Sequence, residues 1–299
     1  MALPLNLDLD FDHVRERLGR GLFAMVAGPE GPQNRSRIHD TPGPRWFADD
    51  RPIRRVHADA SMFVGGLRAL LLQSLHPLAM AGVAQHSDYR GDPWGRLQRT
   101  STFLAVTTFG TATDAQRAVD KVRGIHRRVR GQAPDGRDYR ADDPHLLEWV
   151  HIAEVDSFLQ AYQLYGAAPL DQAGRDDYVA DTARVAAALG VLDPPRTEAD
   201  LRSRLAGYRS ELSSTEAARE AARFLLITPP LSLLARAPYG VLAASAVSML
   251  PPWARLPLRL PYLPPLEATA IRLSGRVLVS GIRWALSANQ PDTVAAQQL

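Results

Sequence analysis

Residues 60–85 read Ala60-Ser-Met-Phe-Val-Gly-Gly-Leu-Arg-Ala-Leu-Leu-Leu-Gln-Ser-Leu-His-Pro-Leu-Ala-Met-Ala-Gly-Val-Ala-Gln85 and are nearly all apolar or small. A stretch this long and this apolar on every side is typical of a buried helix. Pro77 lies inside it, and a proline removes one backbone hydrogen bond and clashes with the preceding turn. We therefore predict one buried helix that is kinked at Pro77.

The residues that follow carry signals for the ends of further helices. Asp92-Pro93 is a cap residue followed by proline, so a helix is expected to begin there and to end before Gly110. Thr113-Asp-Ala-Gln116 has the capping-box pattern and predicts the next helix, which should end at Gly131. Residues 132–143 are expected to form a turn-rich loop.

Similar signals continue to the C-terminus. We expect helices from Pro144 to about Gly166, from Asp171 to Gly190, after Thr197, after Ser214 or Thr215, once within the proline-punctuated residues 228–265, and from Leu266 to about Ala288. The sequence shows no repeat, no convincing strand pair and no Asn-Gly or Asp-Gly hairpin between alternating runs. The predicted class is all-α.

No shift in composition marks an internal boundary, so we expect a single domain over residues 1–299. Within it we expect an irregular N-terminal arm at 1–56, because residues 27–56 are rich in Gly, Pro, Arg and Asp. C-terminal helices are expected at 231–290, followed by a loose tail at 291–299.

The composition limits the chemistry. The 299 residues are 45% hydrophobic, enough for a large core, and include no cysteine. Disulfides, a thiolate haem ligand, iron–sulfur clusters and zinc ribbons are therefore excluded. A formal charge of +3 is too small to indicate a nucleic-acid partner.

The ends of the chain bear on location. Residues 1–10 have no basic region and no continuous apolar run, so they do not resemble a signal peptide, and a cytoplasmic protein is expected. The uncharged run at 237–254 is interrupted by Pro251 and Pro252, which leaves too little helix to span a bilayer. Peripheral contact with a membrane stays open.

The first candidate site lies on the helix after Pro93. Arg96, Arg99, Thr100 and Phe103 are spaced i, i+3, i+4 and i+7, so they share one helix face. Arginines, a hydroxyl and an aromatic ring on one face suit a polar pocket. The more common arrangement is a partly exposed face whose arginines form surface ion pairs.

The second candidate is His126, which lies beside an apolar stripe of Val122, Ile125 and Val129. Gly124 in the same turn would let another group approach the backbone closely. A lone histidine next to such a stripe is more often a core or interface residue than a ligand.

Glu148-Trp-Val-His151 places a carboxylate and an imidazole on one helix face, as di-iron carboxylate proteins require. Those proteins need the motif twice, and no other histidine here has Glu three residues before it. A structural or supporting role for His151 is therefore favoured. His76 and His86 flank the second half of the apolar run, where each could face a cavity; His76 could equally bond a carbonyl freed by the kink.

Several stretches together resemble one family. They are His76-Pro-Leu-Ala-Met-Ala-Gly-Val-Ala-Gln-His86-Ser-Asp, Asp92-Pro-Trp-Gly-Arg96-Leu-Gln-Arg99-Thr100, Phe109-Gly-Thr, Ile125-His126-Arg-Arg-Val-Arg-Gly131 and Tyr139-Arg-Ala-Asp-Asp-Pro-His-Leu-Leu-Glu-Trp-Val-His151. They are similar to the MpaB-type oxygenases, which include latex clearing protein, the bacterial rubber oxygenase. The resemblance covers a family core of about residues 55–230.

This resemblance implies a globin-like helical core around a b-type haem, with additional helices. It implies that His126 is the proximal ligand of the haem iron and that Arg96, Arg99 and Thr100 form the distal segment. It also places His151 near the site. Phe103 shares the distal face, and Arg130 is a candidate partner of a haem propionate, although surface exposure is equally expected for it.

The implied chemistry agrees with the residue types. One imidazole on the iron leaves an axial position for dioxygen, and arginine or threonine can donate hydrogen bonds to charge that develops there. The proximal histidine needs a partner on its other ring nitrogen, which the sequence does not name. Where rubber oxygenase carries a lysine able to ligate iron, this chain has Arg99, which has no acceptor lone pair and should not bind iron.

The expected function is that of a haem b-dependent oxygenase acting with dioxygen on a small apolar substrate, isoprenoid or lipid-like, with cleavage of a carbon–carbon double bond as one option. Loops shorter than those of a rubber-degrading enzyme argue against a polymer substrate. The alternatives are a haem-dependent oxidase or peroxidase-like dehydrogenase, and a non-enzymatic haem-binding or sensor protein.

Overall fold

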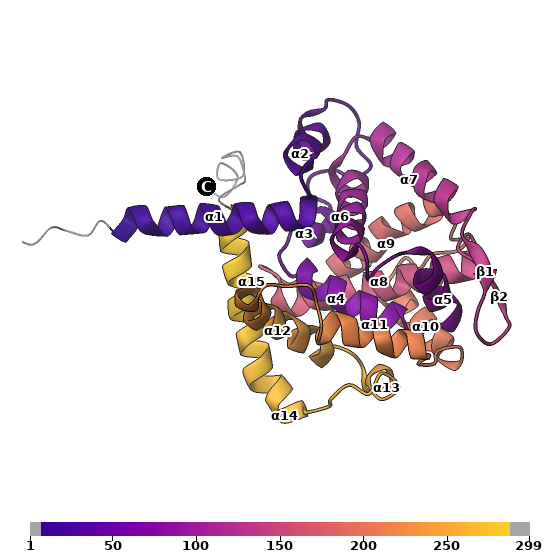
Figure 1. Cartoon of the computed structure of the whole chain (residues 1–299). Coiled ribbons are helices and arrows are strands. Elements are labelled where there is room, and N and C mark those ends of the chain that lie inside the picture. The colour runs from indigo at the N-terminus through magenta and orange to yellow at the C-terminus, as the bar shows by residue number, and fades with distance from the viewer. Residues whose placement is uncertain (1–6, 288–299) are drawn as a thin grey trace, which may run out of the picture.

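The computed structural model describes residues 7–287, which are built almost entirely of helices (Figure 1). In chain order the elements are α1 (Leu7–Ala27), α2 (Gly31–Asp40), α3 (Pro52–His57), α4 (Met62–Gln73), α5 (Pro77–His86), α6 (Pro93–Phe109), α7 (Ala112–His126), β1 (Arg130–Gln132), β2 (Asp138–Arg140), α8 (Pro144–Tyr165), α9 (Gln172–Leu189), α10 (Glu198–Gly207), η1 (Tyr208–Ser210), α11 (Glu216–Leu226), α12 (Leu233–Ser248), α13 (Pro252–Arg255), α14 (Pro264–Leu266), the π-helical η2 (Glu267–Ile271) and α15 (Arg272–Ser287). The all-α prediction is confirmed.

The centre of the molecule is the packing of α4 against α8. Leu71, Leu72, Trp149 and Ile152 are fully buried there. Gly65 permits the close approach, because a Cβ at this position would lie 2.8 Å from the ring of Phe158 and 3.2 Å from its Cα. The backbone of α4 at Gly65 therefore lies directly against Phe158 of α8, and the other elements pack around this pair of helices.

Buried charge pairs fix how these helices are oriented. Arg68 of α4 is 3% exposed, and its guanidinium lies 2.7 Å from the carboxylate of Asp156 and donates a 2.7 Å hydrogen bond to Ser157, both on α8. A charge this deeply buried is tolerated only with a partner. A second, partly exposed ion pair joins Arg51, just before α3, to Asp181 of α9 at 2.7 Å.

The prediction of one kinked helix across Pro77 is wrong. The chain forms two helices, α4 and α5, that meet at 107° across residues 74–76. Pro77 is the first residue of α5, where its missing N–H costs nothing, and His76 before it is extended at ψ 114°. The proline begins a helix here.

The prediction of an irregular arm at 1–56 is also wrong, because this region contains α1, α2 and α3. Its prolines were misleading: Pro32 and Pro52 lie in the first turns of α2 and α3, where proline is favoured. Figure 1 shows α1 running outward from the body and meeting α15. Arg15 donates to the carbonyl of Trp284 and to the hydroxyl of Ser287.

Two local boundaries also differ from the sequence-based predictions. Thr111 caps α7 by accepting from the N–H of Asp114, so the cap lies two residues before the predicted Thr113. The helix ends at His126, and residues 130–140 form an antiparallel hairpin of β1 and β2 instead of a loop. A Pro-Asp-Gly turn with Gly136 at φ +86° connects the strands, a signal that the sequence analysis missed.

The remaining boundaries follow the sequence closely. Asp92, Asp143, Asp171, Thr197 and Thr215 accept hydrogen bonds from the first turns of α6, α8, α9, α10 and α11, and Gly190 ends α9 at φ +118°. The C-terminal helices occupy the predicted region, and the predicted tail at 291–299 lies outside the described residues. No single helix within residues 7–287 is long and apolar enough to cross a membrane; only the bent pair of α4 and α5 passes that test jointly.

The contact at Gly65 gives a stability test. Replacing Gly65 with Ala forces a methyl group against the backbone of Phe158, so we expect a loss of about 1–3 kcal/mol in the free energy of unfolding. Gly66→Ala is the matched control, because its new Cβ would come no closer than 3.9 Å to another side chain. That variant should be neutral or up to about 1 kcal/mol more stable, since alanine favours helix. Urea unfolding of the two variants measures the difference, and equal stabilities would contradict the close-packing account.

Candidate functional site

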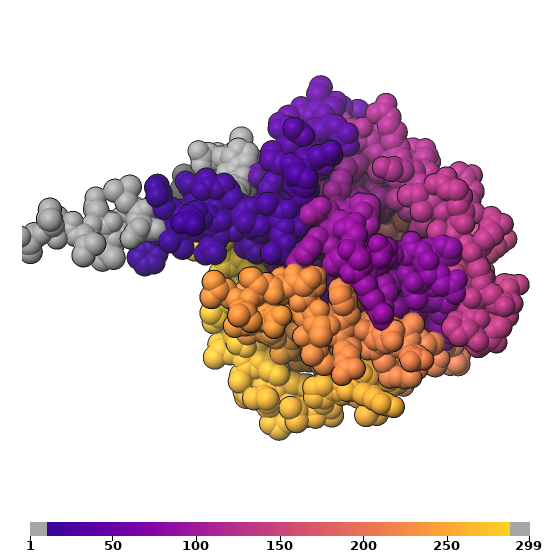
Figure 2. All heavy atoms as spheres, in the orientation of Figure 1, coloured from indigo at the N-terminus to yellow at the C-terminus, as the bar shows by residue number. Residues whose placement is uncertain are grey.

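A recess lies between the helices that carry the predicted site residues. α6 and α7 pack on one another, and α7 and α8 both pack on α9 while having few contacts with each other. The surface is hollowed where the purple α5 and α6 segments face the magenta α7 segment (Figure 2). We call the space bordered by α6, α7 and α8 the recess.

On α8, His151 and Glu154 are three residues apart and both are half-buried. Burial nevertheless lowers the pKa of His151 to about 4 and raises the pKa of Glu154 to about 7. A side chain that is partly exposed to solvent and yet strongly desolvated is typical of the lining of an interior space. Nε2 of His151 is buried and has no hydrogen-bond partner.

A hydrogen-bonded chain from three other helices lies next to Glu154. His57 at the end of α3 contacts the hydroxyl of Thr108 on α6 at 2.8 Å and the hydroxyl of Tyr178 on α9 at 3.3 Å. Burial lowers the pKa of His57 to about 3. Burial, followed by the nearby charges of Glu154 and Asp181, raises the pKa of Tyr178. These groups are therefore held neutral at neutral pH.

His126 is the last residue of α7 and is half-buried. Its Nδ1 is buried and has no hydrogen-bond partner. Burial lowers its pKa, an effect that the negative charge of Asp142 partly opposes. Oδ1 of Asp142 is also buried without a hydrogen bond. Asp142, in the turn between β2 and α8, is therefore the nearest candidate for the ring-nitrogen partner that the sequence did not name.

The apolar stripe of α7 beside His126 is more exposed to solvent than its composition predicted. Ile125 is 42% exposed, and Val122 and Val129 are half-buried. A Cβ added at Gly124 would meet no atom within 4 Å. The end of α7 therefore presents apolar surface and open space instead of packing into the core.

The four predicted residues of α6 separate into two groups. Arg96 and Phe103 are half-buried, and burial lowers the pKa of Arg96. Arg99 and Thr100 are exposed, and Arg99 forms a 3.0 Å ion pair with Asp92. Arg96 is therefore the arginine with the interior position, and Arg99 matches the surface-pair alternative.

The other two candidates, Arg130 and His86, are exposed on the surface. Arg130 is exposed and donates a 2.6 Å hydrogen bond to the carbonyl of Arg127. His86 is exposed and bound to the hydroxyl of Tyr139 at 3.0 Å. Within the described residues, no hydrogen bond or ion pair joins Arg96, His126 and His151 to one another; they lie on α6, α7 and α8, the helices that border the recess.

The motif Glu148-x-x-His151 does not act as a unit. Glu148 accepts a 3.0 Å hydrogen bond from the hydroxyl of Tyr208 and lies 3.2 Å from Arg204, on the side of α10. The carboxylate beside His151 in the recess is Glu154. His76 does not bond a freed carbonyl either, since neither of its ring nitrogens has a hydrogen-bond partner.

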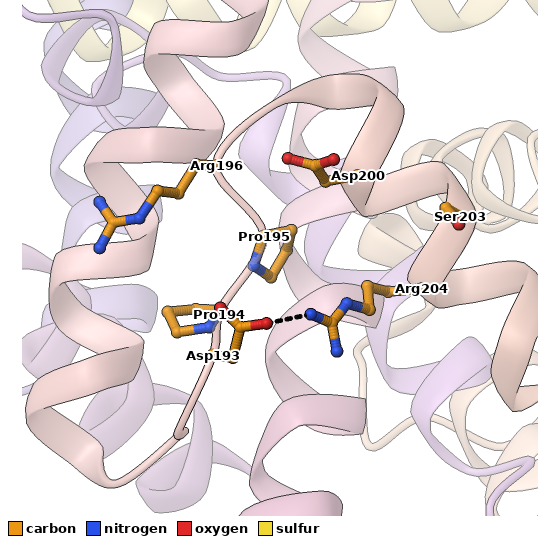
Figure 3. A pocket seen from close by; sticks show the side chains of 7 residues that line it. All are labelled: Asp193, Pro194, Pro195, Arg196, Asp200, Ser203 and Arg204. Carbon is orange, nitrogen blue, oxygen red and sulfur yellow. Dashed lines mark hydrogen bonds and ion pairs between the residues drawn. The ribbon is translucent and has the colours of Figure 1, made fainter.

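A separate surface pocket lies at the start of α10 (Figure 3). It is lined by Asp193, Pro194, Pro195, Arg196, Asp200, Ser203 and Arg204. Its lining is mostly polar, and Arg204 is already paired with Asp193 and Glu148. A pocket lined mostly by polar and charged groups does not suit an apolar ligand.

Sequence reasoning missed His57, Glu154, Tyr178 and Asp142. Glu154 had a usable signal, because it lies three residues from His151 and so on the same helix face. His57 and Tyr178 are 121 residues apart and meet only through the packing of α3 on α9, for which no local pattern exists.

Comparison with known proteins identifies the family. Residues 54–284 match the catalytic domain described as ER-bound oxygenase mpaB/B'/Rubber oxygenase. The chain belongs to this family, and the match extends past the expected core of 55–230 to include the C-terminal helices.

The curated relatives are similar over a shorter stretch. Uncharacterized protein Rv2237 of Mycobacterium tuberculosis and Uncharacterized protein Mb2261 of Mycobacterium bovis are each 36% identical over 100 residues. That stretch is 33% of this chain and spans only 38% of the length of either relative. No solved structure matches the chain.

The pKa of Glu154 leads to a pH-dependent prediction. Between its ordinary pKa of 4.5 and about 7 the folded state binds more protons than the unfolded state, so this residue makes stability fall as pH rises. Glu154→Gln removes that effect, and the variant should exceed the wild type by about 1–3 kcal/mol in the free energy of unfolding at pH 8 and by little at pH 4.5.

Comparing the two proteins isolates Glu154. His151 has the opposite pH dependence, because its lowered pKa makes stability rise between about pH 4 and 6.5, and it is present in both. Denaturant unfolding of the two purified proteins across pH 4.5–8 measures the difference. A difference that stays constant with pH would show that Glu154 ionises normally.

Proposed function

We propose that this protein is a haem b-dependent oxygenase that uses dioxygen on a small apolar substrate. The observation that carries the proposal is the set of desolvated side chains around the recess, among them His151, whose buried Nε2 has no hydrogen-bond partner. A buried polar atom without a partner is costly unless a bound group satisfies it. Membership of the oxygenase family supports the same conclusion.

The residues present fit a haem. A haem is a flat apolar ring that needs an imidazole ligand and space beside it, and the end of α7 offers His126, the exposed Ile125 and the open side of Gly124. When bound, haem would supply a redox-active iron for chemistry with dioxygen. His126 would hold the iron, and Asp142 would accept a hydrogen bond from the second ring nitrogen, which fixes the orientation of the ring.

The opposite wall would come from α6. Arg96 is half-buried and carries several N–H donors, so it can stabilise negative charge in a dry space, where such a donor is worth more than in water. Phe103 would provide apolar contact. Thr100 and Arg99 share this helix face with Arg96 but are exposed in this structure. Arg130 would meet a propionate only by leaving the carbonyl of Arg127.

His151 and Glu154 would take part in proton transfer. His151, with its pKa lowered to about 4, is neutral at working pH, whereas Glu154, with its pKa raised to about 7, can either hold or release a proton. An acid whose pKa is close to neutral is suited to general acid–base chemistry. His57 and Tyr178 hold the neighbouring wall in place.

The substrate would be isoprenoid or lipid-like. Residues 228–265 include apolar side chains that are exposed to solvent, among them Leu233 at 80% and Leu234 at 92% exposure. Leu233 and Leu234 begin α12, which packs mainly on α4 and α15, and we propose that this exposed apolar surface contacts a membrane that holds the substrate. Cleavage of a carbon–carbon double bond and a cytoplasmic location stay predictions.

Labelled oxygen distinguishes the candidate reactions. The purified protein is incubated with haem, a reductant, squalene as an isoprenoid probe and ¹⁸O₂. An oxygenase places label in the organic product, whereas an oxidase or peroxidase-like enzyme leaves the product unlabelled. A haem-binding sensor shows a haem spectrum with no conversion of substrate.

The assignment of the proximal ligand is tested by His126→Ala. The variant should lose most of its haem, because no other described imidazole at the recess has the position of His126 at the end of α7. His86→Ala is the matched control, since His86 is an exposed histidine bound to Tyr139, and it should retain haem. Haem per chain is measured after purification. Retention of wild-type haem with an unchanged ferrous spectrum in His126→Ala would contradict the assignment.

Arg96 and Arg99 are expected to differ in importance. Arg96→Leu should reduce the rate of oxygen consumption by about 100-fold, the usual effect of removing one donor from a dry active site. Arg99→Leu breaks only a surface ion pair with Asp92 and should have a several-fold effect or less. Oxygen-electrode assays on haem-loaded protein give the two rates. The reverse order would place Arg99, not Arg96, at the reacting group.

A further inference from the structure

Three side chains outside the recess converge from separate parts of the chain. His76 lies at the break between α4 and α5, His145 in the first turn of α8, and Glu211 directly after η1. Their ligand atoms all lie within 4.8 Å of one another. Nε2 of His145 is 2.8 Å from Oε2 of Glu211, and Nε2 of His76 is 3.6 Å from the same oxygen.

His76 is the most deeply buried member. It is 2% exposed, its Nδ1 has no partner, and its Nε2 has only the 3.6 Å approach to Glu211, which is too long for a hydrogen bond. Leaving a buried polar group unsatisfied is costly, and such groups are rare in native proteins. The ring is held here by Trp149 and Tyr208, with centroids 6.2 and 6.4 Å away, and its Nε2 is directed at Glu211.

His145 is oriented by a chain of hydrogen bonds. Its Nδ1 contacts the hydroxyl of Tyr208 at 3.0 Å, and that hydroxyl contacts Glu148 at 3.0 Å. The rings of His145 and Tyr208 stack at 4.5 Å. The same hydroxyl also contacts the carbonyl oxygen of His145 at 2.8 Å. When its proton goes to Glu148 or to that carbonyl, the hydroxyl accepts from Nδ1–H of His145, and the lone pair of Nε2 then faces the carboxylate of Glu211, an arrangement that a proton or a cation between them stabilises.

We propose that His76, His145 and Glu211 bind a divalent transition-metal ion of the zinc class. Two imidazoles and one carboxylate form a donor set that zinc accepts, whereas calcium and magnesium prefer oxygen ligands alone. With bonds of about 2.0–2.1 Å, neighbouring ligand atoms in a tetrahedral site are about 3.3 Å apart. The observed 2.8 and 3.6 Å to Glu211 bracket this value, while the two imidazole nitrogens lie within 4.8 Å of each other, so binding requires the His76 and His145 rings to approach by up to about 1.5 Å.

The surroundings match known metal sites. Hydrogen bonding of a carboxylate to the far side of a ligating histidine, here through Tyr208, is the usual way in which such a ring is oriented. His145 and Glu211 have side chains 51% and 40% exposed, so a water molecule can occupy the fourth position. His145 precedes His151 by six residues, or about 9 Å along α8, so the two sites are separate.

The test uses the full chain, first stripped with a chelator and then titrated with Zn²⁺ and with Co²⁺. We expect one ion per chain by equilibrium dialysis, and with Co²⁺ the intense visible bands of a four-coordinate site. Glu211→Gln and His145→Gln should each weaken zinc binding at least tenfold. Both positions are partly exposed, so these variants are expected to fold even if a change at buried His76 does not.

Two controls separate this site from other metal binding. Glu220→Gln removes an exposed carboxylate of α11 that pairs with Arg90, in the turn between α5 and α6, and should bind zinc like the wild type. His126→Ala should lose haem but keep its zinc, which makes the result independent of the proposed haem function. If no zinc binds, or if either Glu211→Gln or His145→Gln binds it as tightly as Glu220→Gln, the cluster is an ordinary ion pair and the proposal is overturned.

Discussion

The buried ion pair between Arg68 and Asp156 is the constraint on which the rest of the structure depends. It joins α4 to α8 at 2.7 Å where the helices already touch at Gly65, and so it fixes the rotation of α8 about its axis. Removing either partner would leave an uncompensated charge in the core, which is far more costly than losing a surface pair. With α8 fixed, His151 and Glu154 are held towards the recess while Glu148 is held towards Tyr208.

One helix therefore supplies two different polar environments. On the recess side, desolvation keeps His151 neutral and brings the pKa of Glu154 to about 7. Nearer the start of α8, Glu148 and Tyr208 orient His145 by hydrogen bonds. The break before Pro77 matters for the second environment, because a continuous helix would not bring His76 to Glu211. Both environments contain buried nitrogen atoms without partners, and these are the positions at which bound groups are expected.

Much of the fold was predictable from local chemistry. Asp92, Asp143 and Asp171 indicated where their helices begin, because an N-cap depends only on one side-chain oxygen and the backbone N–H groups of the turn that follows. The break at Pro77 was not predictable, since a proline at a kink and a proline at a helix start look alike in sequence. For the site, family resemblance indicated His126 and the α6 face, but the separation of Arg96 from Arg99 and the approach of Asp142 to His126 depend on how distant segments pack.

The central claim is that the recess holds a b-type haem. The most direct measurement is the absorption spectrum of the purified full-length protein, with the pyridine haemochrome assay to identify and count the haem. The account predicts a Soret band, the haemochrome of haem b and about one haem per chain, with a ferric form that lacks two strong nitrogen ligands. Protein that shows no Soret band even after incubation with haem, or that contains only non-haem iron, would contradict it.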